Sequence, residues 1–142
     1  MAGINYGRVV LGGLAAGVVA NVCDTITAMF ILADDMQGMV QRLNLDLRVV
    51  DSAGVATTWL VVDFIYGTLI VWTYAAIRPR LGAGPKTAAT AGVVLYLAVT
   101  VVLFGFQRMG VFTPDLFLKS AALSLVTSVL ASLAGGYVYK ES

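Results

Sequence analysis

The sequence predicts an all-α polytopic membrane protein, a four-transmembrane-helix bundle with a short interfacial helix between spans 1 and 2. Of the 142 residues, 59% are hydrophobic and only 12% are charged. The mean hydropathy of +0.89 lies well above that of soluble domains. Four segments also reach the length of about 20 apolar residues that crosses the hydrocarbon core of a bilayer. We therefore expect residues 1–142 to form a single membrane domain, with spans at about 9–32, 54–77, 88–106 and 116–139.

The first span carries small and polar residues on one helix face. Gly13 and Gly17 form a G-x-x-x-G pair, and steps of three or four residues continue that face to Asn21 and Asp24. Small residues let a second backbone approach closely, and polar side chains avoid lipid by hydrogen bonding across such a contact. This face is therefore predicted to point into the protein.

The outer connection, at about 34–52, is too long for a simple turn. Met36, Met39, Val40 and Leu43 recur in it at helical spacing, which favours an amphipathic helix lying in the membrane interface. Such a helix could simply cover the bundle, or it could act as a lid or as a docking surface for a partner.

The second span contains one ionisable residue, Asp63, among large apolar side chains. Gly67 follows one turn later and allows close approach, while Tyr66 offers a hydroxyl group within one turn of the carboxylate. In the connection that follows, Pro79 and Pro85 are expected to stop helices.

The fourth span repeats small residues every four positions. The favoured interpretation is a helix-packing seam that lets a neighbouring backbone approach. A polar pore lining is the alternative, although serine hydroxyls can also bond to carbonyls of their own helix. The repeat consists of Ser120, Ser124, Ser128, Ser132 and Gly136.

Lysine and arginine counts give a weak topology signal. With the N-terminus inside, five of the nine basic residues lie on the inner side and four on the outer side. The positive-inside rule then favours an N-in, C-in arrangement.

The most specific signal is the matching depth of Asp24 and Asp63. At 1.5 Å per residue, both lie roughly 12 Å below the outer boundary of their spans. Consecutive antiparallel helices are usually neighbours. Because two like charges in a low dielectric cannot both ionise cheaply, at least one acid should be protonated, or a cation should lie between them. Lys119 could bridge to one of them or extend to lipid headgroups.

Two interpretations of these acids stay open. In one, they form a site for an ion, a proton or a ligand. In the other, a neutral aspartic acid bonds to Asn21, Thr25, Tyr66 or a backbone carbonyl and merely fixes the helix register.

Composition removes several classes of function. With one cysteine, Cys23, and no histidine, neither an intrachain disulfide nor a Cys/His metal site can form, and we expect no cofactor. The net charge of +1 does not favour nucleic acid. No nucleophile with an adjacent base can be assembled, so we expect neither catalytic residues nor enzymatic activity.

Two function classes remain. The first is a membrane accessory or scaffold protein that packs through small-residue seams and binds a partner, a lipid or a small ligand near Asp24 and Asp63. The second is a proton- or cation-coupled transporter or channel that uses the same acids. Membrane lipids are expected partners, and assembly as a homo-oligomer or within a larger membrane complex is expected because four such helices enclose little volume.

Two stretches carry a family resemblance: "NYGRVVLGGLAAGVVANVCD" at 5–24 and "YAAIRPRLGAGPKTA" at 74–88. Together they resemble a group of small bacterial four-span membrane proteins without an established activity. The resemblance covers about a quarter of the chain. It implies a bacterial cytoplasmic (inner) membrane and brings no site residues to transfer.

Overall fold

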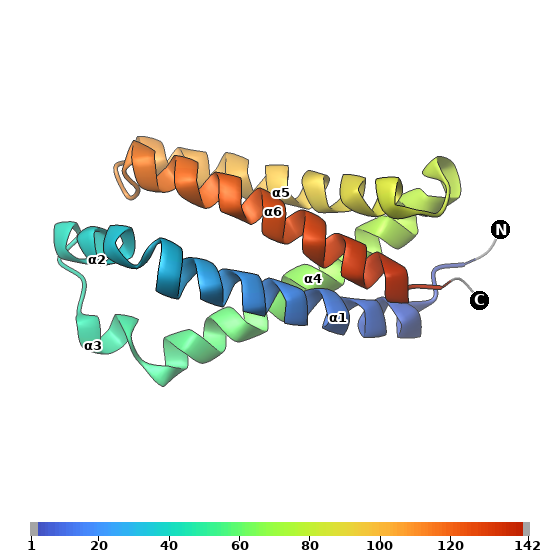
Figure 1. Cartoon of the computed structure of the whole chain (residues 1–142), viewed down its shortest axis with the longest axis horizontal. Helices are drawn as coiled ribbons and strands as arrows, with labels where there is room; N and C mark the ends of the chain where they lie inside the picture. The colour runs from blue at the N-terminus through green and yellow to red at the C-terminus, as the bar shows by residue number, and fades with distance from the viewer. Residues whose placement is uncertain (1–2, 141–142) are drawn as a thin grey trace.

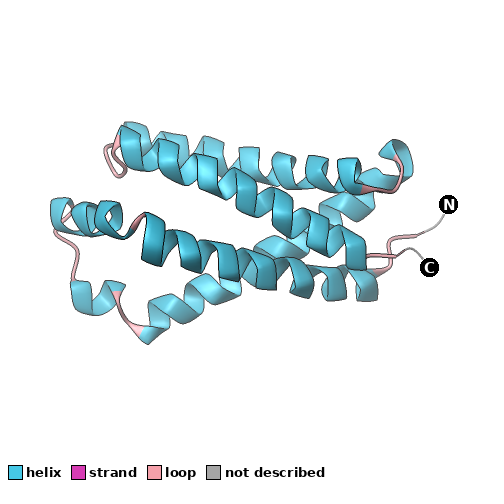
Figure 2. Ribbon diagram, in the orientation of Figure 1, coloured by secondary structure: helices cyan, strands magenta, loops and turns pink. Residues whose placement is uncertain are grey.

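The computed structural model describes residues 3–140, which form helices joined by short connections, with no strand in that range (Figures 1 and 2). Four stretches are long and apolar enough to cross a membrane. They confirm the predicted all-α architecture with four candidate spans, each a few residues longer at one or both ends than predicted. They are α1 (Tyr6–Ile26) with the π-helical turn η1 (Thr27–Ile31), α4 (Ala53–Leu81), α5 (Pro85–Arg108) and α6 (Pro114–Val138).

The connection between the first two spans contains two helices, α2 (Ala33–Arg42) and α3 (Leu47–Val50). Asp34 and Asp35 lie in the first turn of α2 and Arg42 in its last, an order that complements the helix dipole. A helix in this segment was expected. Its location in the membrane interface remains a prediction.

Polar side chains define where three spanning helices begin. Each accepts a hydrogen bond from a backbone amide three residues later, which satisfies a donor that the first helical turn leaves unpaired. The capping residues are Asn5 for α1, Ser52 for α4 and Thr113 for α6.

The prediction that Pro79 stops the second span is wrong, because α4 continues through it to Leu81. Proline lacks an amide hydrogen, but in the last turn this removes only one helical hydrogen bond, the one that would reach the carbonyl of Ala75. The helix ends instead at Gly82, which has a φ of 82° and donates its amide to the carbonyl of Arg78.

The spans form a four-helix bundle in which α1 packs against α4 and α6, and α5 packs against α6 and α4. The start of α1, the α4–α5 turn and the end of α6 lie at one end, which we call the terminal end (Figure 1). The opposite α2 end comprises residues 33–51 and the α5–α6 turn at 109–113. Helix α4 runs obliquely and diverges from α5 and α6 toward the α2 end (Figure 1).

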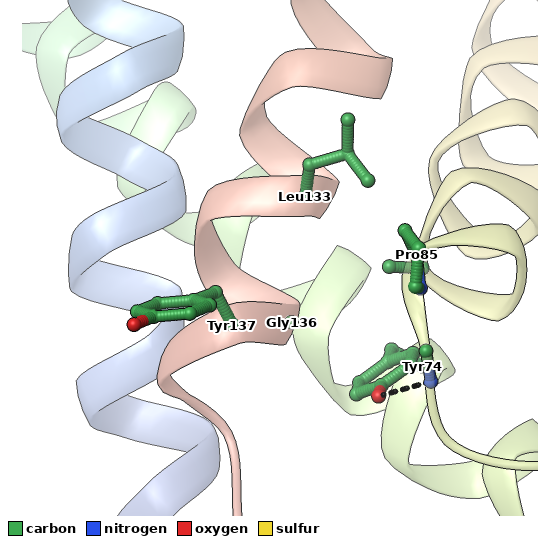
Figure 3. A pocket seen from close by; sticks show the side chains of 7 residues that line it. Tyr74, Pro85, Leu133, Gly136 and Tyr137 are labelled. Atoms are coloured by element: carbon green, nitrogen blue, oxygen red, sulfur yellow. Dashed lines mark hydrogen bonds between the residues drawn. The ribbon is translucent and has the colours of Figure 1, made fainter.

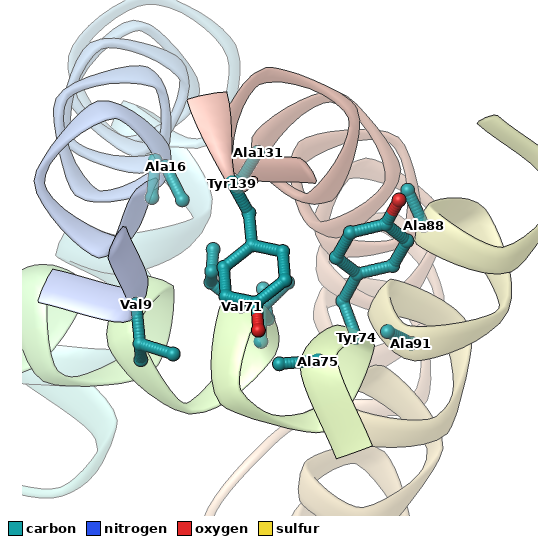
Figure 4. Close-up of a cluster of buried hydrophobic side chains, with 11 residues drawn as sticks. Val9, Ala16, Val71, Tyr74, Ala75, Ala88, Ala91, Ala131 and Tyr139 are labelled. Atoms are coloured by element: carbon teal, nitrogen blue, oxygen red, sulfur yellow. The ribbon is translucent and has the colours of Figure 1, made fainter. Parts of the chain in front are cut away.

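The buried core lies toward the terminal end and consists mostly of small side chains (Figure 4). The rings of Tyr74 and Tyr139 pack edge to face with centroids 5.8 Å apart. The amide of Asn5 donates to the Tyr139 hydroxyl over 3.3 Å, which ties the start of α1 to the end of α6. Further members of the core are Val9, Ala16, Val71, Ala75, Ala88, Ala91 and Ala131.

Glycines bring α1 into backbone contact with α4 and α6. A Cβ atom at Gly67 would lie 2.5 Å from the amide nitrogen of Gly17 and 2.8 Å from the carbonyl oxygen of Gly13. A Cβ atom at Gly12 would lie 2.8 Å from the carbonyl oxygen of Gly135. No side chain fits at these positions without moving a backbone, so the helices can approach this closely only because the residues are glycine.

Candidate functional site

A cavity of about 240 Å³ lies between the four spans in the half of the bundle toward the α2 end. Its lining comes from Asp24 of α1, residues 59–66 of α4, residues 96–103 of α5 and residues 117–128 of α6. These segments belong to the region where α4 diverges from α5 and α6 (Figure 1). We call this space the acidic cavity.

Both predicted acids line the acidic cavity, although they lie on different helices. The side chain of Asp63 is only 8% exposed, and among residues 3–140 it has no hydrogen bond or ion pair. Asp24 is exposed and lines the cavity together with Thr127 of α6. The two carboxylates come from adjacent helices, α1 and α4, and line the same cavity. A shared site for the two carboxylates is therefore geometrically available.

Two of the partners expected for a purely structural aspartic acid bond elsewhere. The side-chain amide of Asn21 donates to the carbonyls of Gly17 at 2.9 Å and Leu60 at 3.3 Å, and so joins α1 to α4. The Tyr66 hydroxyl forms a 2.8 Å hydrogen bond with the Ser128 hydroxyl, which joins α4 to α6. Neither residue fixes the Asp63 carboxylate.

Lys119 lies with the acids of the α2 end. Its ammonium group bonds to Asp35 of α2 at 3.0 Å and to Asp115 at 2.7 Å. The possible bridge from Lys119 to Asp24 or Asp63 is therefore not formed. The reason is that two other carboxylates lie beside the lysine, Asp115 on α6 itself and Asp35 on α2.

The repeated small residues of α6 divide into two groups. Ser128 and Ser132 are buried, and the Ser132 hydroxyl donates to the carbonyl of Val129. Gly136 lies beside Ala88 of α5. Ser124, by contrast, is exposed and lines the acidic cavity. It departs from the predicted packing seam because the oblique α4 leaves this part of α6 uncovered.

Sequence inspection missed several residues of the acidic cavity. Thr127 is buried and lines the cavity with Asp24, and its position one turn after Ser124 could have placed it on the same face. Tyr96 and Thr100 also line the cavity from α5. Their spacing of four residues was the available signal in a span that otherwise looks featureless.

The acidic cavity ends where the glycine contacts begin. On α4, Gly67 and Ile70 follow Asp63 toward the terminal end, and both are buried. Gly67 touches the backbone of α1, as described above. Among the described residues, the polar lining of the cavity therefore stops at these closely packed residues and does not continue to the terminal end.

A second hollow of about 480 Å³ lies at the terminal end, between the start of α5 and the end of α6 (Figure 3). Tyr74, Pro85, Leu133, Gly136 and Tyr137 surround it, and the Tyr74 hydroxyl accepts a 3.3 Å hydrogen bond from the amide of Gly84. The described residues around it include no carboxylate or basic side chain. Although this hollow is larger, the acidic cavity holds the chemically distinctive groups.

The donor set of the acidic cavity is not that of a metal centre. Within residues 3–140, no three His, Cys, Asp or Glu side chains gather closely enough to hold a metal ion. The cavity offers two carboxylates, several hydroxyl groups and aromatic rings. This set can bind a cation or a hydrogen-bond donor and can exchange protons.

Comparison of the chain with protein-family models, with curated proteins and with solved structures found no match in any of the three. No activity or site residue therefore transfers to this chain from those comparisons. Its length, hydropathy and helix arrangement are those of a multi-pass membrane protein with four candidate spanning helices.

Proposed function

We propose that this protein is a small integral membrane binding protein that holds a small cationic ligand in the acidic cavity, beside Asp24 and Asp63. The observation that carries the proposal is Asp63, which is 8% exposed and lacks a hydrogen-bond or ion-pair partner among the described residues. It lines a cavity to which all four spans contribute.

The physical reason is the cost of a buried acid without a partner. A carboxylate with little access to water is stabilised by an opposite charge or by hydrogen-bond donors. A bound cation would compensate the negative charge of Asp63 and Asp24, which line the same cavity. Ligand binding thus explains why the chain keeps two acids where leucine would cost less.

The rest of the bundle supports an accessory or scaffold role around this site. The glycine contacts hold α1 against α4 and α6, while the outward faces of the spans carry apolar residues such as Leu14, Val18, Val101 and Val126. We propose that these faces contact membrane lipids or further copies of the chain. The proposal includes no catalytic step.

Fluorescence can test ligand binding directly, because one of the two tryptophans, Trp59, lines the acidic cavity. With Trp72→Phe as background, the purified protein in nanodiscs is titrated with sodium, potassium and choline chlorides. We expect a saturable change in Trp59 emission with at least one cation, and its loss in Asp63→Asn. Asp51→Asn, which changes an exposed acid outside the cavity, serves as the control. The proposal fails if no cation gives a saturable change, or if the two variants behave alike.

A proton- or cation-coupled transporter is the second candidate, supported by the pairing of two carboxylates in one cavity. The contact of Gly67 with the backbone of α1 weighs against a transporter, because transport past this contact would require α1 and α4 to separate. Flux into proteoliposomes, compared among the parent protein, Asp24→Asn and Asp63→Asn, decides between them. We expect no proton or cation flux in the parent protein. Flux that both substitutions abolish would favour the transporter.

A further inference from the structure

The walls of the acidic cavity are aromatic as well as acidic. Trp59 comes from α4, Tyr96 from α5 and Phe117 from α6, so three helices each bring a ring to the space that contains the two carboxylates. The ring centroids of Phe117 and Phe104 of α5 lie 5.8 Å apart. Aromatic faces attract cations, and tryptophan does so most strongly.

A bare metal ion fits this cavity poorly. Calcium takes six to eight oxygen ligands at about 2.3–2.6 Å, and magnesium requires a tighter octahedral shell. The acidic cavity has two carboxylates, and much of its remaining wall is apolar, including Val62, Val99 and Leu103. Its volume of about 240 Å³ equals about eight waters at about 30 Å³ each. The occupant should therefore be larger than an ion and should carry its own apolar surface.

We propose that the ligand is an organic ammonium ion, with its positive charge beside Asp63 and Asp24 and its alkyl groups against the rings of Trp59, Tyr96 and Phe117. This inference rests on the proposed function, since it names the ligand class of the same site. Carboxylates supply the charge that an ammonium group needs, and the rings supply contact with the weakly hydrated alkyl groups that surround it.

An ammonium group could arrive free in solution or as part of a lipid headgroup. Asp63 lies ten residues after the start of α4 at Ala53, about 15 Å along a helix that rises 1.5 Å per residue. A headgroup would have to descend that far into the bundle. The recognised chemistry is the same for both sources, so the test includes an arm for each.

Equilibrium dialysis with radiolabelled choline tests the inference on the full chain in nanodiscs of phosphatidylglycerol, whose headgroup has no ammonium. Unlabelled choline should displace the label, whereas the neutral isostere 3,3-dimethyl-1-butanol should be at least ten-fold weaker. Sodium and potassium at equal ionic strength should not displace it. Asp63→Asn should weaken choline binding at least ten-fold.

The aromatic walls are tested by Trp59→Leu, which should weaken choline binding about 3- to 30-fold. Its matched control is Trp72→Leu, a tryptophan on the same helix that does not line the cavity and whose loss should leave binding unchanged. If Trp59→Leu does not fold, Phe117→Leu tests the same walls. Equal effects of Trp59→Leu and Trp72→Leu would overturn the aromatic contribution.

The outcomes separate the inference from the proposed function. Saturable binding of sodium or potassium without choline would overturn the organic ligand but keep the cation site. Equal binding of choline and its neutral isostere, or no binding of any cation, would overturn both. Displacement of choline by dihexanoylphosphatidylcholine would support a lipid headgroup as the source, and lack of displacement would support a free ammonium ion.

Discussion

The two halves of the bundle contain the same four helices but are packed in opposite ways. Toward the terminal end, glycine and alanine occupy the contacts, and Ala91 and Ala131 are fully buried. Toward the α2 end, the same helices carry Trp59, Tyr96 and Asp63 around an open cavity. The size of the contact residues therefore decides where the bundle is closed and where it has room for a ligand.

This difference follows from how helices associate in lipid. Lipid tails are as apolar as leucine, so large apolar residues give little reason for two spans to approach, whereas small residues allow close van der Waals contact. Gly67 therefore allows α4 to lie directly against the backbone of α1, and we call this the Gly67 contact. Beyond it α4 diverges, and the polar residues that would be costly in lipid face the resulting cavity.

Disrupting the Gly67 contact should have the largest effect on the stability of the protein. In Gly67→Val, the new side chain would meet the backbone of Gly13 and Gly17, so we expect a loss of at least about 3 kcal/mol in the free energy of unfolding, or no folded protein. Unfolding in detergent micelles measures it. The control is Gly105→Val, where an added Cβ meets open space among the described residues and stability should change by less than about 1 kcal/mol. Equal losses would show that the glycine contact does not hold the halves together.

Replacing Asp63, in the half that contains the acidic cavity, by an apolar residue should make the protein more stable. Asp63→Leu removes a buried carboxylate without a partner, so we expect unfolding to cost about 1–3 kcal/mol more, while cation binding disappears. Denaturant titration in detergent measures the gain, and Asp63→Asn, which keeps a polar side chain, should gain less. A loss of stability in Asp63→Leu would mean that the carboxylate is a packing group.

Substitutions at the boundary between the two halves, where Tyr66 and Ser128 form a hydrogen bond, should change stability less. Ser128→Ala removes the hydrogen bond to the Tyr66 hydroxyl and should cost about 1 kcal/mol. Ser124→Ala, one turn away on the cavity wall, should change stability little, since the Ser124 hydroxyl has no hydrogen bond among the described residues. The comparison uses thermal unfolding of both variants. A larger loss of stability in Ser124→Ala than in Ser128→Ala would show that the packed half does not end at Ser128.

The smallest effect is expected at the α2 end, where Lys119 joins α6 to Asp35 of α2. The pair is exposed, so Lys119→Met should leave global stability unchanged. Amide hydrogen exchange of residues 33–42 should nevertheless become faster, because one attachment of α2 is lost. Arg42 would still donate to the carbonyls of Gly110 and Val111. Unchanged exchange would show that the Arg42 contacts alone hold α2.

The sequence predicted what depends on local composition and period. Hydropathy and length identified the four spans, and equal depth along two neighbouring helices placed Asp24 and Asp63 on one cavity. The oblique course of α4 could not be read in this way, because it depends on which glycine meets which backbone. The Lys119–Asp35 pair joins residues 84 positions apart, a separation at which no periodicity carries information. Tyr96 and Phe117 were missed because their roles depend on the same crossing geometry.

The most direct test of the central claim, a cavity in the half toward the α2 end that is closed by packing toward the terminal end, is thiol accessibility along α6. In a Cys23→Ala background, Ser124→Cys and Ser132→Cys are each exposed to a membrane-impermeant trimethylammonium thiol reagent from either side of sealed proteoliposomes. We expect modification at position 124 from one side only and none at position 132, which is fully buried. Modification of both positions at similar rates, or of position 124 from both sides, would contradict the account.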